Sequence, residues 1–80
     1  MPTILREGPY RFFFFSDEGS EPPHVHVYRD GKVAKIWLSH VAMAANEGFA
    51  AHELTRILRI VRVQRDSMIE AWHGYFGSAG

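Results

Sequence analysis

Short apolar runs that alternate with polar residues fill the first half of the chain, a pattern typical of β-strands. We predict a strand over residues 3–6, a turn over 7–9 and a second, aromatic-rich strand over 10–15. Residues 16–23 carry the polar residues, glycine and prolines of a loop.

Two further β-prone runs, 24–29 and 32–38, flank the dipeptide Asp30-Gly31. Asp-Gly between such runs favours a type I′ turn, because both central residues of that turn need a positive φ. The sequence therefore predicts an antiparallel hairpin that turns at this dipeptide.

The turn also predicts the register of the hairpin and the face on which each side chain lies. The expected pairs are Arg29–Lys32, Tyr28–Val33, Val27–Ala34, His26–Lys35, Val25–Ile36 and His24–Trp37. The expected core face carries Val25, Val27, Ala34 and Ile36. The expected outer face carries His24, His26, Tyr28, Val33, Lys35 and Trp37.

From Ala50 onward the apolar residues follow the 3.6-residue period of a helix. The stripe comprises Leu54, Ile57, Leu58, Val61, Met68, Ile69, Trp72 and Phe76. Arg65 falls on the same stripe, and Asp66-Ser67 could cap a new helix. We therefore expect either one long helix or two helices with a bend near 64–66. The segment 39–49 is compatible with a fifth short strand or with an extended crossing.

Together these elements predict an α+β fold in which residues 1–80 form a single domain. A small antiparallel sheet of three to five strands has one face covered by the long or bent C-terminal helix. No stretch reaches the ~18 apolar residues of a transmembrane helix, and the N-terminus lacks the pattern of a signal peptide. We expect a cytoplasmic protein that does not bind membranes.

Composition narrows the chemistry that this domain can perform. Nine basic residues balance nine acidic ones, which argues against a protein that binds nucleic acid over its whole surface. The chain has no cysteine, so thiolate zinc sites and cysteine nucleophiles are excluded. Any metal would need histidine and carboxylate ligands alone.

His24 and His26 are the main candidates for chemistry, because they share one face of a strand roughly 6–7 Å apart. Glu21, held by the following proline pair, is the nearest acid and could orient a histidine. Lys35, opposite His26, should lower the pKa of that histidine and oppose a metal cation. Three interpretations remain open: polar residues tolerated on a strand, acid–base or phosphate-contacting residues, and metal ligands. We expect no cofactor and no tightly bound metal.

Other residues could contact phosphate or a partner protein. Arg11, Arg56 and Arg59 are candidate phosphate-binding residues, although arginines opposite a helix stripe are more often simply solvated. Trp37, Ile60 and Val63 are candidate partner-binding residues: Trp37 is on the outer face, and Ile60 and Val63 lie off the helix stripe.

Several segments of the chain resemble a small bacterial family, domain of unknown function 4160. The similar segments are MPTILRE, YRFFFFS, EPPHVHV, AKIWL, GFAAHELTRI and EAWHGYFG. The stretch from Glu21 to Val27 is the most specific, while Glu18 is an additional acid beside it.

The resemblance implies a toxin-like subunit of a bacterial type II toxin–antitoxin module. Its expected partner is an antitoxin-like protein of the domain of unknown function 2442 type, encoded by an adjacent gene; a homodimer is also compatible. The expected activity is metal-independent RNA cleavage, with His24 and His26 as acid and base, Glu21 orienting one of them, and Lys35 or Arg11 binding phosphate. The alternative is a protein- or nucleic-acid-binding module without catalysis.

Overall fold

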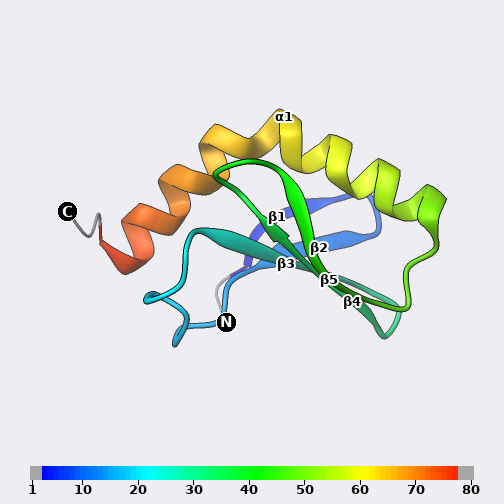
Figure 1. Cartoon of the computed structure of the whole chain (residues 1–80), viewed down its shortest axis with the longest axis horizontal. Coiled ribbons are helices and arrows are strands. Elements are labelled where there is room, and N and C mark those ends of the chain that lie inside the picture. The colour runs from blue at the N-terminus through cyan, green and yellow to red at the C-terminus, as the bar shows by residue number, and fades with distance from the viewer. Residues whose placement is uncertain (1–2, 78–80) are drawn as a thin grey trace.

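The computed structural model describes residues 3–77, which form a five-stranded antiparallel sheet and one long helix (Figure 1). The strands are β1 (Thr3–Glu7), β2 (Tyr10–Phe13), β3 (His24–Arg29), β4 (Lys32–Trp37) and β5 (Ala42–Glu47). They lie in chain order, each paired with the next. The helix, α1 (Ala51–Phe76), runs across one face of the sheet, so the predicted α+β fold is confirmed.

The β3–β4 hairpin has the predicted register at all six pairs. Asp30 and Gly31 have φ values of 50° and 79°, as a turn with two left-handed residues requires. The four residues predicted for the core face are all buried. Alternation of side chains and the turn dipeptide were therefore sufficient to orient this hairpin.

Two segments differ in detail from the expected boundaries. Residues 42–47 form a fifth strand, β5, which decides between the two alternatives for 39–49. The second strand ends at Phe13 instead of residue 15. Phe14 then packs into the core against Trp72 and Phe76 of the helix.

The C-terminal segment is one continuous helix of 26 residues. It ends at Gly77, whose N–H donates a hydrogen bond to the carbonyl oxygen of His73. Arg65 does not interrupt the helix; its guanidinium donates hydrogen bonds to the backbone oxygens of Leu38 and Ser39 at 2.9 and 2.8 Å. The charged head thus binds carbonyl groups that follow β4.

The two off-stripe helix residues differ in their surroundings. Ile60 is 9% exposed and belongs to the core, so little of its side chain is available to a partner. Its side chain lines a cavity beside the β1–β2 turn. Val63 is 76% exposed and stays available for contact. The helix of the described chain is not apolar enough to cross a membrane.

Candidate functional site

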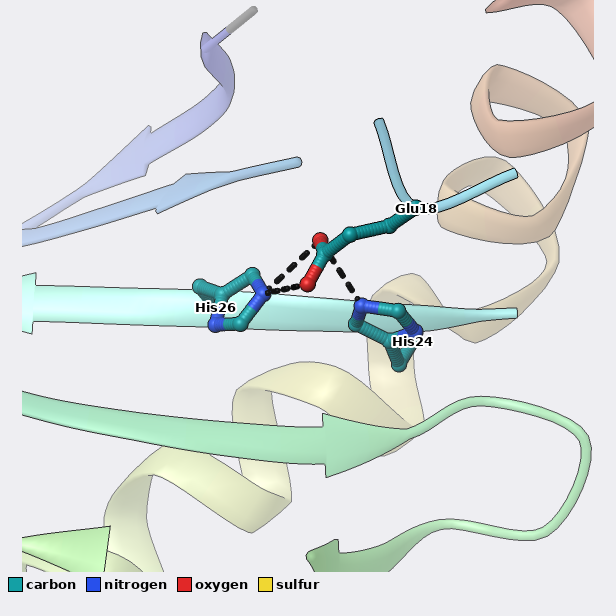
Figure 2. Close-up of side chains that lie close together, drawn as sticks. All are labelled: Glu18, His24 and His26. Carbon is teal, nitrogen blue, oxygen red and sulfur yellow. Dashed lines mark hydrogen bonds and ion pairs between the residues drawn. The ribbon is translucent and has the colours of Figure 1, made fainter. Parts of the chain in front are cut away.

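The loop between β2 and β3 brings Glu18 against both histidines of β3 (Figure 2). Nε2 of His26 lies 2.9 and 3.0 Å from the two carboxylate oxygens of Glu18. Nε2 of His24 lies 2.9 Å from Oε1 of the same carboxylate. One carboxylate therefore bridges two imidazoles that are two residues apart on one strand.

A short turn holds Glu18 in this position. Its carboxylate accepts a hydrogen bond from the N–H of Phe15, and its own N–H donates weakly to the carbonyl oxygen of Phe15. Phe14, immediately before this turn, is anchored in the core. The loop is thus fixed at its start by packing and at Glu18 by hydrogen bonds.

His24 is completely buried, which corrects the expectation that it lies on an exposed face. Its ring packs against Trp37 of β4 and Trp72 of α1, with ring centroids 5.7 and 4.9 Å apart. Trp72 reaches the first residue of β3 because α1 remains unbroken through its last turns. His24 has no surface from which it could contact a molecule in solution.

His26 is 9% exposed and lies between two phenylalanines. Phe13 stacks on its ring, and Phe15 meets it edge-on. The ring also lines a cavity of about 290 Å³ on the outer face, together with Phe15, Val33, Ala34, Lys35, Ala45 and Glu47. His26 is therefore the member of the pair that borders open space.

Glu21 does not orient a histidine, contrary to the expectation from the sequence. It accepts a hydrogen bond from Nζ of Lys35 at 2.7 Å. Lys35 also lies over the ring of Trp37. Glu18 performs the role predicted for Glu21. In the sequence, Glu18 stands out only as an acid in a polar turn three residues after Phe15. That pattern does not show whether Glu18 or Glu21 folds back onto the histidines.

The pKa values of Glu18 and His26 both lie below their ordinary values. Burial alone would raise the pKa of Glu18, but the two nearby imidazoles and the N–H of Phe15 together lower it. Burial lowers the pKa of His26, and Glu18 only partly offsets this effect. Lys35 lowers the pKa of His26 further, as predicted, but contributes less than burial.

The candidate phosphate-binding arginines lie in two separate places. Arg11 pairs with Tyr28 across β2 and β3, which puts it on the outer face of the sheet. There it donates to Oγ1 of Thr3 and lies over the ring of Phe13. Arg56 and Arg59 are exposed on α1 and line a different cavity, next to the β1–β2 turn.

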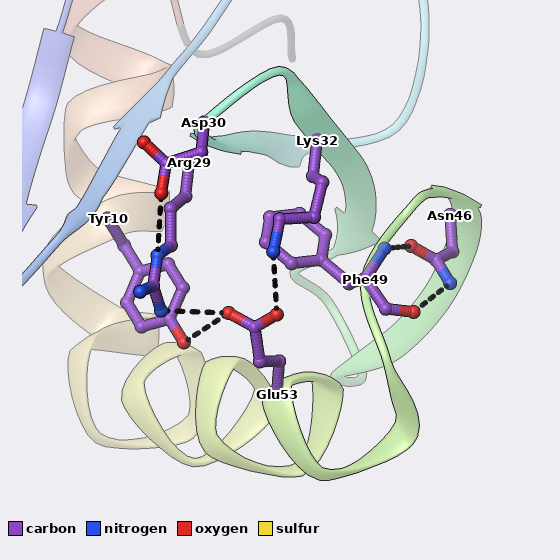
Figure 3. Close-up of polar contacts among 7 residues, drawn as sticks. All are labelled: Tyr10, Arg29, Asp30, Lys32, Asn46, Phe49 and Glu53. Atoms are coloured by element: carbon purple, nitrogen blue, oxygen red, sulfur yellow. Dashed lines mark hydrogen bonds and ion pairs between the residues drawn. The ribbon is translucent and has the colours of Figure 1, made fainter.

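A second polar cluster, centred on Glu53, escaped the sequence reasoning (Figure 3). The Glu53 carboxylate accepts hydrogen bonds from Arg29 at 2.9 Å, Lys32 at 3.1 Å and the Tyr10 hydroxyl at 3.2 Å. Every one of these contacts joins α1 to the sheet. Two cationic side chains thus surround the Glu53 carboxylate, and these contacts connect the helix to the sheet.

Glu18, His24 and His26 also have the composition of a metal site. Each offers one ligand atom, and these atoms all lie within 4.8 Å of one another. The sequence argument against a metal relied on a missing third ligand and on the charge of Lys35. Glu18 supplies that ligand, and Glu21 offsets that charge.

Comparison with known proteins identifies the family of this chain. No curated protein and no solved structure matches it. The family described as domain of unknown function (DUF4160) matches residues 10–73, a range that contains Glu18, both histidines and most of α1. The chain therefore belongs to the DUF4160 family.

Proposed function

We propose that this protein is the toxin-like subunit of a two-protein bacterial module and that it binds RNA on the outer face of its sheet. The observation that carries the RNA-binding part is the cavity of about 290 Å³ bordered by His26 and Lys35. The two-protein module is what the family resemblance implies, with an antitoxin-like protein of the domain of unknown function 2442 type as the partner.

The outer face combines cationic groups with aromatic surface, which single-stranded RNA recognition uses. Lys35 is half-buried at the cavity on β4, and Arg11 lies on the same face two strands away, on β2. Phe15 and Tyr28 are exposed aromatic residues nearby. Phosphate can displace the Glu21 carboxylate from Lys35, because both are anions that the ammonium group binds.

RNA cleavage by two histidines is less well supported than RNA binding. An acid–base pair needs both imidazoles within reach of the phosphate and its leaving group. His24 has no exposed surface, so His26 is the single histidine of the pair that can approach a ligand. This burial favours the alternative, a binding module without catalysis, and an RNA cleavage assay separates the two.

The RNA-binding proposal is tested by fluorescence anisotropy with single-stranded RNA over a range of salt concentrations. Lys35→Ala should weaken binding and lower the slope of log K against log salt concentration by about 1, since one phosphate contact is lost. Arg62→Ala is the matched control: it removes the same charge from an exposed position on α1 and should bind like the wild type. Equal binding by both variants, with both folded, would refute the proposal.

The module proposal is tested by inducing the chain alone and together with the product of the adjacent gene. Growth should stop in the first case and recover in the second, and the two proteins should purify as a complex. Normal growth on induction alone, together with no complex, would contradict the toxin-like role without affecting the RNA-binding result.

A further inference from the structure

His24 presents a buried nitrogen that has no hydrogen-bond partner among residues 3–77. Nε2 of His24 is fully shielded from solvent, and although it lies 2.9 Å from Oε1 of Glu18, the two are not aligned as a hydrogen bond. A buried polar group without a partner is costly, and native structures rarely keep one without a reason.

The other nitrogen of His24 determines which tautomer this ring adopts. Nδ1 lies 3.0 Å from the carbonyl oxygen of Pro22. A carbonyl oxygen only accepts hydrogen bonds, so Nδ1 carries the proton and donates it. In the neutral ring, Nε2 is then a lone pair directed toward the lone pairs of a carboxylate. A positive species between the two atoms relieves this contact: either a proton on Nε2, which needs the hydrogen-bond alignment that these atoms lack, or a metal ion.

We propose that Glu18, His24 and His26 form a binding site for a divalent transition-metal ion, for which Zn²⁺ is the probe. Two histidines and one glutamate are a ligand set that zinc and non-haem iron(II) sites use. The lone pair of His24 Nε2, which has no hydrogen-bond partner, becomes a metal ligand.

The distances in the cluster agree with this assignment. Two donors in adjacent positions around a metal with ligand bonds of about 2.1 Å lie roughly 3.0–3.4 Å apart. Each histidine Nε2 lies 2.9 Å from a Glu18 oxygen, and all three ligand atoms fall within 4.8 Å of one another (Figure 2). Metal binding would bring the three ligand atoms toward a common centre.

The surroundings of His24 are those of a metal ligand. A ligating histidine usually donates its second N–H to a carbonyl or carboxylate, which orients the ring. The carbonyl oxygen of Pro22 provides this contact for His24, and Trp37 and Trp72 hold the ring in place. The first residue of the proline pair therefore orients a ligand through its carbonyl oxygen.

Solvent and ligands can approach the site from one side. The side chains of Glu18 and His26 retain 14% and 11% exposure, whereas that of His24 has none. Three protein ligands leave at least one coordination position free, as in catalytic metal sites. Nitrogen ligands argue against Ca²⁺ and Mg²⁺, which prefer oxygen.

The experiment measures Zn²⁺ binding to the purified full chain by titration calorimetry and by metal content after dialysis. The wild type should take up one Zn²⁺ per chain. Substituting a residue that only contacts a metal ligand typically lowers metal affinity ten- to hundredfold. Glu18→Gln removes a ligand itself, so its affinity for Zn²⁺ should fall by more than that. Glu70→Gln is the matched control: it is the same chemical change at an exposed position of α1 outside the cluster, and it should bind zinc like the wild type.

A second measurement does not depend on any variant. In NMR spectra of the wild type, one equivalent of Zn²⁺ should shift the ring-nitrogen signals of His24 and His26 and leave those of the exposed His52 and His73 unchanged. Absence of stoichiometric uptake, equal affinity in the two glutamine variants, or shifts confined to the exposed histidines would each overturn the proposal. The metal site does not rest on the RNA-binding proposal, because Lys35, the residue whose substitution tests RNA binding, is not one of the three proposed metal ligands.

Discussion

Glu53, in the first turn of α1, is a buried carboxylate whose partners come from the sheet. The hydrogen bond from Lys32 is the largest cause that lowers its pKa, and the Tyr10 hydroxyl and the charge of Arg29 act in the same direction. A carboxyl group whose pKa is lower in the folded state stabilises the fold above its unfolded pKa. This stabilisation is lost as the pH falls through the folded pKa.

Glu53→Gln keeps the side-chain shape and removes the charge. At pH 7 the variant should unfold at a lower urea concentration than the wild type, because Lys32 and Arg29 lose their anionic partner. The difference should narrow as the pH falls below about 4.3, the unfolded value for glutamate. Urea unfolding from pH 7 to pH 3 measures it. The exposed Glu70→Gln should stay within about 0.5 kcal/mol of the wild type, and a Glu53 difference independent of pH would contradict the assignment.

At the scale of elements, one glycine lies in the hairpin turn and another in the helix, and these two positions need different backbone conformations. Gly31 has φ of +79° in the turn, whereas Gly74 lies within α1. A Cβ added at either position would meet nothing within 4 Å. Steric space therefore plays no part, and only the backbone conformation decides the effect of a substitution.

The two alanine substitutions should have opposite signs. Gly31→Ala forces an L-residue into the left-handed region and should lower the free energy of unfolding by about 1 kcal/mol. Gly74→Ala should raise it by about 0.5 kcal/mol, since alanine favours the helix. Chemical denaturation of both variants measures this pair of effects. Destabilisation by both would show that the last turns of α1 are not helical in solution.

At the scale of the whole molecule, the sheet is open and the core is small. Within residues 3–77, β1 and β5 each pair on one side only, so both edges of the sheet are free. Residues 44–47 of β5 are exposed. Free edges and the exposed Val63 are features that an oligomer or a partner would cover.

We therefore expect the chain to exist as an oligomer or in a complex with the adjacent gene product. Light scattering should give a mass above that of the monomer. Val63→Lys should weaken the assembly about tenfold, as the ~1.5 kcal/mol of burying a valine implies. Thr55→Lys, at another exposed position of α1, introduces the same charge and should leave assembly unchanged. A stable monomer without affinity for the neighbouring protein would disprove this expectation.

Most of the fold could be predicted because its signals are local. Asp30-Gly31 selects one turn type, and alternation then assigns every hairpin residue to a face. The helix stripe likewise follows from spacing alone. The strand at 42–47 and the continuity of α1 past Arg65 were undecided, because both depend on contacts with distant segments.

The candidate site divides along the same line. The sequence by itself determined that His24 and His26 share one face of β3, and that Lys35 lies opposite His26, because strand period and turn type require it. Only the tertiary structure decided that Glu18 and not Glu21 meets the histidines, and that Trp72 buries His24. The physical reason is that a loop's path and a helix's last turns are set by packing between residues far apart in the chain, and local sequence patterns carry no information about that packing.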